Sequence, residues 1–423
     1  MPNCRGHGVL PIGARACASS RGAASYTGGP PPPALALNLL GSHFRRFFDA
    51  NPQLLHFAAH SHHPWPDATR EAHQRYWEDA ATLVDRKWDR IFGEVIPAAQ
   101  AHVAHLLSLS DPAQVAFAPN THEFVARLYS CFDARPLRVL TSAHEFHSFR
   151  RQTRRLQEDG RVEVTEVAGE PWPTFAARFA EAARSRPWDL VFLSHVFYDS
   201  GFVVPGLEAI CAAAPERATV VIDGYHAFCA LPVDLSAVHR RAFYLAGGYK
   251  YAMSGEGCCF LAVPPGNRLR PADTGWFASF ETLSGPPGTA VPFNDDAFRF
   301  WGATFDPSGL YRFNAAMDWL RSTGTTIEDV HRHAGLLQER FLEGLQRERV
   351  TALPMSALVP PRGVPRGNFV TFDLDDAERV HQRVKEAGVY VDRRDRRIRF
   401  GFGVYHDAAA VDRLLQVLRE ALG

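Results

Sequence analysis

Short apolar runs alternate with amphipathic stretches through the middle of this chain, and the alternation limits the folds that it can adopt. The stretches near 121–132, 147–158, 173–185 and 206–214 have helical periodicity. Strands that alternate with helices in this way predict an α/β fold with a large, doubly wound, mainly parallel seven-stranded sheet. Ligands of such sheets bind beyond the carboxyl ends of the strands. The apolar runs fall at 114–118, 137–141, 162–167, 190–194, 219–223, 242–246 and 258–263.

A chain of 423 residues is longer than one ordinary core accommodates, so we expect a large and a small domain. Helices are expected at 67–90 and 94–108, then near Asp306 and at 326–345, with a long Pro- and Gly-rich loop segment at 264–300. The last part alternates β, β, α, β, β, α from about 348 to 422, which predicts a small α+β domain. The expected division is an N-terminal extension at 1–38, an arm at 39–64, a large domain at 65–300, and a linking helix with the small C-terminal domain at 301–423.

Residues 1–38 differ in composition from the rest of the chain. They are rich in Gly, Ala, Pro and Ser, and no acidic residue precedes Asp49. A transit peptide can have such a composition, but no arginine-bearing amphipathic helix is evident, and no apolar h-region marks a secretory signal. We expect a disordered tail or a mis-assigned start, and leave this segment out of the predicted fold.

The charge balance excludes several classes of partner. The 46 basic and 46 acidic side chains give a formal net charge of zero, so we expect neither a nucleic-acid partner nor a membrane partner. No apolar run approaches the roughly 18 residues of a membrane-spanning helix. The seven cysteines are scattered without a CxxC pair, which favours reduced thiols in the cytoplasm over a disulfide framework or a structural zinc site.

Lysine is unusually scarce in this chain. It occurs only at Lys87, Lys250 and Lys385, and every other basic residue is arginine. The skew is also what a biased coding composition would produce. A guanidinium stays protonated and forms no Schiff base, so a retained lysine is a candidate for chemistry that arginine cannot perform.

One of these lysines follows a buried strand, next to a second strand that ends in a carboxylate. The run at 219–223 ends at Asp223, and the run at 242–246 ends just before Gly247–Gly248–Tyr249–Lys250. Both side chains are therefore expected at one edge of the sheet. Pyridoxal phosphate (PLP) needs this pair, because an amine must form an imine with its aldehyde carbon and a carboxylate must keep its pyridine nitrogen protonated. Considered alone, an aspartate such as Asp223 is more often a turn residue or a helix cap, and a lysine such as Lys250 is more often a surface charge.

The segment around Lys250 resembles the lysine region of the class V aminotransferase superfamily, of PLP fold type I, and the kynureninase group in particular. That group has the pattern D-x-x-H followed by Y-K-Y and a glycine-rich turn, matched here by Asp223, His226, Tyr249 and Lys250. The resemblance covers roughly residues 50 to 420. It implies that Lys250 forms the internal aldimine, that Asp223 pairs with the pyridine nitrogen, and that His226 and Tyr249 help to hold the cofactor.

Two further segments resemble cofactor-binding parts of the superfamily. Asn120, Thr121 and His122 lie between a predicted strand and a predicted helix, where backbone N–H groups can hold a phosphate, or where Thr121 could simply cap the helix. The resemblance implies that Thr121 is the phosphate-binding threonine. It also implies that Phe146 stacks on the pyridine face, although a core phenylalanine at a strand end is the plain alternative.

The resemblance extends to two further residues, one of which is expected to act across two chains. Trp276 belongs to a Gly-Trp segment like that of the kynureninases, which implies a contact with the substrate. Thr304 matches the Gly-Thr turn that reaches the phosphate of a neighbouring subunit, though this copy carries an extra residue. Sites of this fold type are usually shared between two chains, so the resemblance implies a homodimer.

Arg399 and His60 are the remaining predicted substrate contacts. Arg399 matches the arginine of the superfamily's closing motif, which binds the substrate α-carboxylate through two parallel hydrogen bonds. Because arginine is abundant in the segment, a solvated charge run is the competing interpretation. His60 lies in the sequence AAHSHHPW at 58–65 and is expected at the mouth of the cofactor site. Zinc binding by His60, His62 and His63 is the weaker interpretation, because no cysteine and no clear acid beyond Asp67 lie nearby, so we predict no metal.

Two departures from the kynureninase pattern bear on the substrate. Residues 58–65 replace an Asn-Ser-Leu-Gly type segment that lines the substrate pocket. Phe197 occupies the position of an amide that usually contacts the phenolic oxygen of the cofactor, a bond that Tyr198 or Asp199 could supply instead. The substrate is therefore expected to be a small amino acid other than kynurenine.

The sequence leaves several functions open. The first is a kynureninase-like hydrolase or lyase, in which Lys250 removes the α-proton before a side-chain bond breaks. A class V aminotransferase needs the same residues. A cysteine desulfurase needs a nucleophilic cysteine well downstream of the lysine, and the chain has none after Cys259. A catalytically silent binding protein with this fold is the non-enzyme alternative.

Overall fold

The computed structural model of the chain describes residues 40–282 and 290–423. The expected N-terminal extension at 1–38 lies outside these described residues. The described part contains one seven-stranded, one four-stranded and one two-stranded sheet.

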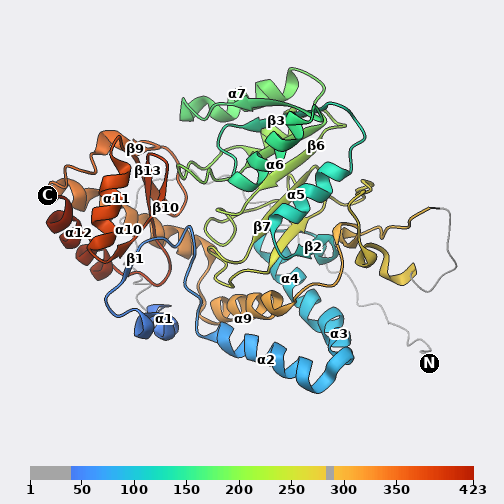
Figure 1. Ribbon diagram of the computed structural model, residues 1–423, viewed down its shortest axis with the longest axis horizontal. Coiled ribbons are helices and arrows are strands. Elements are labelled where there is room, and N and C mark those ends of the chain that lie inside the picture. Colours follow the sequence, from blue (N-terminus) through green and yellow to red (C-terminus); the bar gives the residue numbers. More distant parts are fainter. Residues whose placement is uncertain (1–39, 283–289) are drawn as a thin grey trace, which may run out of the picture. The chain divides into compact units, whose positions relative to one another are not determined.

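The seven-stranded sheet confirms the predicted α/β architecture (Figure 1). The strand order is β2-β8-β7-β6-β5-β3-β4. The neighbours from β7 to β4 pair in parallel, while β8 runs antiparallel to both β7 and β2. Central parallel strands are covered on both faces, which explains their continuous apolar runs. The strands are β2 Val115–Ala118, β3 Leu137–Ser142, β4 Val162–Val167, β5 Leu190–Ser194, β6 Thr219–Asp223, β7 Ala242–Gly247 and β8 Cys259–Ala262.

Helices cover the sheet. α5 and α6 pack against each other, as do α7 and α8. Crossovers between parallel strands are right-handed as a rule, which places these two pairs on opposite faces of the sheet. The helix expected at 67–90 is interrupted, because Val84 has a left-handed backbone (φ 52°) that ends α2. The segment expected as a loop holds two short 3-10 helices, Trp276–Thr282 and Ala297–Phe300. The α-helices from the N-terminal arm to residue 322 are α1 Arg45–Ala50, α2 Ala68–Leu83, α3 Lys87–Arg90, α4 Ile96–Leu106, α5 Thr121–Ser130, α6 His147–Glu158, α7 Phe175–Arg184, α8 Leu207–Ala213 and α9 Ser308–Ser322.

The C-terminal part forms the predicted small α+β unit, with one difference. Its antiparallel sheet has the order β12-β13-β10-β9. The additional strand β11 pairs in parallel with β1 of the N-terminal arm. Two-residue strands carry too little alternation to be recognised in a sequence, so this pairing could not be predicted. The elements are β1 Leu55–His56, α10 Ile327–Arg347, β9 Leu358–Val359, β10 Phe369–Asp373, α11 Ala377–Glu386, β11 Val389–Tyr390, β12 Asp392–Arg394, β13 Arg397–Gly401 and α12 Ala408–Leu422.

Two separate groups of buried apolar side chains stabilise these layers. One surrounds the large sheet and includes residues of α9, which lies beside α2 (Figure 1). The other lies between the small sheet and helices α10, α11 and α12. The domain bounds at 65–300 and 301–423 stay a proposal, in which α9 links the two groups.

The described residues contain free cysteines and no membrane-crossing helix. Cys131, Cys211, Cys229, Cys258 and Cys259 are free thiols. No helix in the described part combines the length and the apolarity that a membrane crossing requires.

The small core offers a direct test of the packing. Phe341 on α10 is fully buried, and its ring centroid lies 4.9 Å from that of Phe400 on β13. Replacing it with alanine leaves a cavity, so we expect Phe341→Ala to lower the free energy of unfolding by about 3–5 kcal/mol. Leu336 on the same helix is 61% exposed. Leu336→Ala is the matched control, with an expected change within about 0.5 kcal/mol. Urea unfolding followed by circular dichroism measures both, and equal midpoints would contradict the assigned packing.

Candidate active site

Two neighbouring strands of the large sheet bring Asp223 and Lys250 to the same edge. β6 ends at Asp223, whose carboxylate accepts a hydrogen bond from the Tyr225 backbone N–H at 2.9 Å. β7 ends at Gly247, and a turn closed by the Ser254 N–H donating to the Gly248 carbonyl presents Lys250. Parallel pairing of β6 with β7 therefore sets the relative positions of the carboxylate and the amine.

Two glycines beside these residues are required by close packing. A Cβ atom on Gly224 would lie 1.9 Å from Cζ of Tyr244. A Cβ atom on Gly247 would lie 2.3 Å from the hydroxyl oxygen of Tyr225. Both contacts are far shorter than atoms tolerate, so side chains here would push the two strand ends apart.

The Lys250 amine is enclosed by a histidine and three aromatic rings. Its Nζ lies 2.9 Å from Nε2 of His226. The centroids of the Tyr225, Phe146 and Tyr249 rings lie 4.9, 5.3 and 5.5 Å from the same atom. The side chain is almost fully buried, so bulk water does not solvate its charged form.

Burial changes the protonation of this group of residues. It lowers the pKa of Lys250 to about 7, and the nearby positive charge of Arg399 acts in the same direction. Burial raises the pKa of Asp223, although the charge of Lys250 opposes the rise. Burial also holds the pKa of His226 well below its usual range. Near neutral pH, Lys250 is therefore poised between its charged form and a nucleophilic free amine.

A cavity of about 530 Å³ opens in front of the amine. Small-molecule sites have volumes of roughly 300–1,000 Å³, so this one can hold a cofactor with part of a substrate. Among the residues predicted from sequence, those that line it are Asn120, Thr121, His122, Phe146, Asp223, His226, Tyr249 and Lys250.

The structure places two predicted residues elsewhere. Trp276 and Thr304 line a separate hollow of about 620 Å³, together with Trp88 and Phe92. Trp276 is 45% exposed there. Within one chain these two side chains do not reach the Lys250 cavity.

Arg399 lies on β13 of the small sheet, close to the cavity but not on its wall. Its guanidinium donates to the Asp392 carboxylate and to the backbone carbonyl oxygen of Tyr198. Arg394 also contacts Asp392, at 3.3 Å, so a single carboxylate lies between two guanidinium groups. The Nε atom of Arg399 is buried and has no hydrogen-bond partner among the described residues.

His60 lies next to this charged cluster. Its ring stacks on Phe369 with centroids 4.5 Å apart, and its Nε2 lies 3.9 Å from an oxygen of Asp392. Neither ring nitrogen has a hydrogen-bond partner among the described residues. Burial, reinforced by Arg399, holds the pKa of His60 well below its usual range, so the ring is neutral.

The other two histidines of this segment face different partners. The His62 ring stacks on Tyr249 with centroids 4.9 Å apart, and His63 packs edge-on against Tyr405. Within residues 40–282 and 290–423, no three His, Cys, Asp or Glu side chains are grouped so that they could hold a metal ion.

Tyr198 is the better placed of the two residues that could replace the missing amide. It lines the cavity, and its ring meets that of Phe146 edge-on, with centroids 5.4 Å apart. Asp199 instead accepts hydrogen bonds from His144 and Arg397, at 2.8 and 2.6 Å.

Sequence reasoning missed a buried carboxyl group behind the cavity. The hydroxyl groups of Ser142 and Ser194 donate to Glu145 at 2.5 Å each, and Ser194 itself lines the cavity. Burial raises the pKa of Glu145 to about 8, so the group is mainly protonated at neutral pH. The sequence signal was present, since Ser142, Glu145 and Ser194 all lie at or just after carboxyl ends of predicted strands.

Comparison with known proteins identifies related sequences. Residues 57–414 match the family described as aminotransferase class-V. The chain is similar to isopenicillin N epimerase from Streptomyces clavuligerus, with 30% identity over 53% of this chain and 58% of that protein. It is also similar to kynureninase from Pseudomonas fluorescens, with 29% identity over 55% of this chain and 56% of that protein. Each match thus spans little more than half the length of the relative.

Solved structures show the same fold at low sequence identity. Cysteine desulfurase from Thermococcus onnurineus NA1 superposes with a TM-score of 0.74 at 17% identity, covering 88% of this chain and 95% of that one. A mutant of C-DES, with glycine covalently linked to its PLP cofactor, gives a TM-score of 0.75 at 18% identity and covers 89% of this chain and 99% of that one. At these identities the likeness concerns the fold alone.

The lowered pKa of Lys250 can be tested by labelling the cofactor-free protein. The amine is protonated below its pKa of about 7 and free above it, so acylation of Lys250 should rise about tenfold per pH unit up to pH 7 and then level off. Asp223 raises this pKa, so Asp223→Asn should move the plateau to lower pH. Peptide mass spectrometry resolves the sites, with Lys87 and Lys385 as internal references. Labelling of Lys250 that still rises steeply above pH 9 would contradict the assignment.

Proposed function

The chain belongs to the class-V aminotransferase family, whose members are pyridoxal-phosphate enzymes, and on that premise we propose that it is a kynureninase-like hydrolase or lyase acting on a small α-amino acid other than kynurenine. The observation that carries this proposal is the Lys250 amine, buried beside Asp223 in a cavity large enough for a cofactor and part of a substrate. A class V aminotransferase is the alternative within the family.

The residues around the cavity fit pyridoxal phosphate. An amine and a carboxylate of perturbed pKa share the cavity. On the cavity wall, a Cβ atom added to Gly257 would have its nearest neighbour, Nη2 of Arg312, at 3.9 Å, so there is space at this position. When bound, the cofactor withdraws electrons from the substrate α-carbon and so weakens the bonds to it. In our proposal Lys250 would bind the cofactor covalently, Asp223 would pair with its ring nitrogen, and Phe146 would stack on its ring face. The phosphate would lie at the N-terminus of α5, whose N–H groups favour an anion. The cofactor-binding set that we propose is Asn120, Thr121, His122, Phe146, Asp223, His226, Tyr249 and, from a neighbouring chain, Thr304.

Lys250 is also the group that we propose as the base for the α-proton. Above pH 7 its amine is largely unprotonated, so it can accept a proton without first losing one. His226, at 2.9 Å, can hold the amine in position through a hydrogen bond. Since His226 stays neutral, it adds no positive charge that would resist protonation of Lys250.

Arg399 is our proposed contact for the α-carboxylate of the substrate. Its unpartnered Nε and its nearness to Lys250 support this role, and a planar guanidinium can bind a carboxylate through two N–H groups. Asp392 accepts a hydrogen bond from Arg399 and so orients its guanidinium. Arg394 forms an ion pair with the other oxygen of the same carboxylate. We propose that His60, whose ring nitrogens have no hydrogen-bond partner among the described residues, contacts the substrate next to Arg399.

The reaction that follows α-proton removal distinguishes the candidates. Side-chain cleavage defines the hydrolase or lyase, and amino-group transfer defines the aminotransferase. One curated relative is named an epimerase, so inversion at the α-carbon is a third outcome to assay. Desulfuration is disfavoured, because no cysteine follows Cys259. A silent binding protein is the alternative without turnover.

A homodimer is part of the proposal. Trp276 and Thr304 lie away from the cavity of their own chain, which is the arrangement expected if they complete the site of a second copy. A cytoplasmic location is proposed because the cysteines are scattered and those at 131, 211, 229, 258 and 259 are free thiols.

Loss of the Lys250 amine provides the first test. We expect protein mixed with pyridoxal phosphate to show the absorbance band of a lysine-bound cofactor, and Lys250→Ala to lack it and to lose at least about 100-fold in turnover. Lys385→Ala, at an exposed lysine, should keep both. Product assays with kynurenine, with alanine plus a keto acid, with cysteine, and for α-carbon inversion separate the reactions. A band that persists in Lys250→Ala refutes the assignment of Lys250, and a band without any turnover supports the binding protein.

The role of Arg399 predicts a separate effect on substrate binding. We expect Arg399→Gln to raise KM about 10- to 100-fold with a smaller change in kcat, because one charge-assisted, bidentate contact is lost. Arg399→Lys should restore little, since a lysine cannot reproduce the two parallel bonds. Arg396→Gln changes an exposed arginine of the same hairpin and serves as the control. Unchanged KM in Arg399→Gln, with the absorbance band intact, would refute the carboxylate contact.

A further inference from the structure

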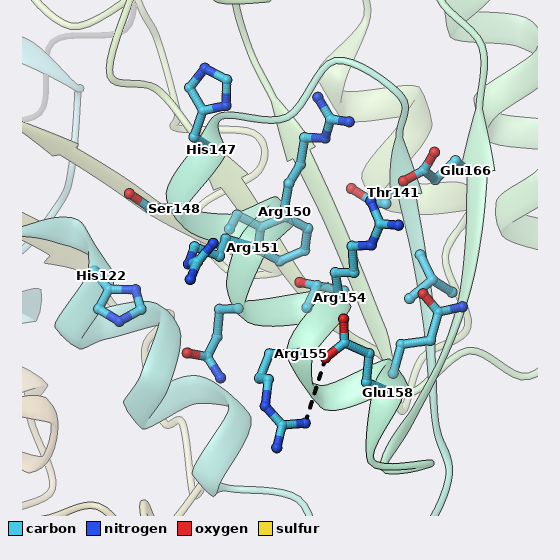
Figure 2. A pocket seen from close by; sticks show the side chains of 15 residues that line it. His122, Thr141, His147, Ser148, Arg150, Arg151, Arg154, Arg155, Glu158 and Glu166 are labelled. Atoms are coloured by element: carbon cyan, nitrogen blue, oxygen red, sulfur yellow. Dashed lines mark ion pairs between the residues drawn. The ribbon is translucent and has the colours of Figure 1, made fainter.

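A third hollow, of about 1,370 Å³, extends along helix α6 and is lined by arginines (Figure 2). The side chains of Arg150, Arg151, Arg154 and Arg155 all project from α6 into this region (Figure 2). The acidic residues of its lining are Glu158 and Glu166. We call this hollow the arginine groove.

The sequence of α6 explains how the arginines come to lie together. Phe149, Thr153 and Leu156 are buried against the sheet and fix one face of the helix. The positions between them, four of which are arginine, therefore face outward. Residues four apart lie about 6 Å apart along a helix, a spacing that two anionic groups of one small molecule can match.

Most of this charge is not neutralised by the protein. Arg155 forms ion pairs with Asp159 and, at 3.8 Å, with Glu158. Within the described part of the chain, Arg150, Arg151 and Arg154 form no ion pair with a carboxylate. All three are exposed, so an anionic ligand could reach them from solvent.

The arginine groove adjoins the cofactor cavity. His122 and Ser148 line both hollows. Arg150 also lies close enough to Tyr198, which lines the cofactor cavity, for its charge to act on the tyrosine hydroxyl. A molecule whose amino-acid end lies at Lys250 could therefore extend into the groove without leaving the protein surface.

We propose that the arginine groove binds an anionic extension of the substrate, so that the substrate is an α-amino acid whose side chain carries phosphate or carboxylate groups at its far end. This inference rests on the proposed function. Guanidinium groups bind both kinds of oxyanion through paired N–H donors, so the two share one recognition chemistry. A solvated arginine face is the competing explanation, and the shared walls of the two hollows, which put the arginines beside the Lys250 cavity, argue against it.

The binding test uses the holoenzyme, whose cofactor fills the phosphate position of the main site. Inorganic pyrophosphate and citrate are titrated in separate calorimetric experiments, which distinguish a phosphate from a carboxylate preference. We expect at least one of them to bind, with an affinity that falls as salt is raised. Arg151→Gln combined with Arg154→Gln should weaken that binding at least about tenfold, because two charge-assisted contacts are lost.

The matched control changes the net charge equally at a distant place. Arg383→Gln combined with Arg413→Gln removes two exposed arginines from α11 and α12, and should leave the affinity unchanged. Binding of neither probe, equal binding by wild type and the Arg151/Arg154 double variant, or equal weakening in both double variants would overturn the proposal.

A kinetic comparison connects the groove to the reaction. O-phosphoserine, glutamate and alanine are compared as substrates in the reaction identified by the product assays. In the Arg151/Arg154 double variant we expect a higher KM for an anionic substrate and an unchanged KM for alanine. An equal change in KM for both substrates would overturn the proposal. The cofactor absorbance band is recorded in parallel. Loss of that band in the wild type would point to failure of the proposed function, whereas a normal band with unaltered anion binding in the variant points to failure of the groove alone.

Discussion

The site depends on burying a primary amine at the edge of a sheet without leaving it permanently charged. An ionised amine removed from water is costly, and proteins avoid that cost mainly by shifting the pKa of the group. Here burial and the positive Arg399 lower the pKa of Lys250 to about 7, while Asp223 opposes the shift. The amine is thus held close to the point at which it changes protonation state. Strand pairing fixes this balance, because β6 and β7 set the carboxylate and the amine at adjacent strand ends.

The two sheets contribute different parts of the site. The large sheet supplies Lys250, Asp223 and the buried Glu145, which lie at or just beyond the carboxyl ends of its strands. The small sheet supplies Arg399 and Asp392 from β13 and β12, and the contact of Arg399 with the Tyr198 carbonyl joins the small sheet to the wall of the cavity. In our proposal the first group serves the cofactor and the second the substrate. A change of substrate then requires changes mainly in the small sheet and in the arm at residues 58–65, where the sequence departs from the kynureninase pattern.

The parts predicted well from sequence are those fixed by local periodicity and by strand ends. All seven strands of the large sheet, the helix at 147–158 and the meeting of Asp223 with Lys250 follow from apolar runs and parallel pairing. The parts that could not be predicted depend on contacts between distant segments. The pairing of β11 with β1 and the stacking of His60 on Phe369 leave no periodic signal. Trp276 and Thr304 are a further case, because their proposed role needs a second chain.

The distribution of lysine and arginine separates the chemical tasks of this surface. An arginine cannot act as the amine of Lys250, because it stays protonated at every accessible pH. For the same reason, arginines near the cavity cannot compete with Lys250 for an aldehyde, however many there are. They can only bind anions or lower the pKa of the amine, as Arg399 does. A chain with almost no other lysine can therefore place four arginines on α6 beside the cofactor cavity and still leave one reactive amine within it. The arginine groove then extends the site toward anionic groups without adding a second nucleophile.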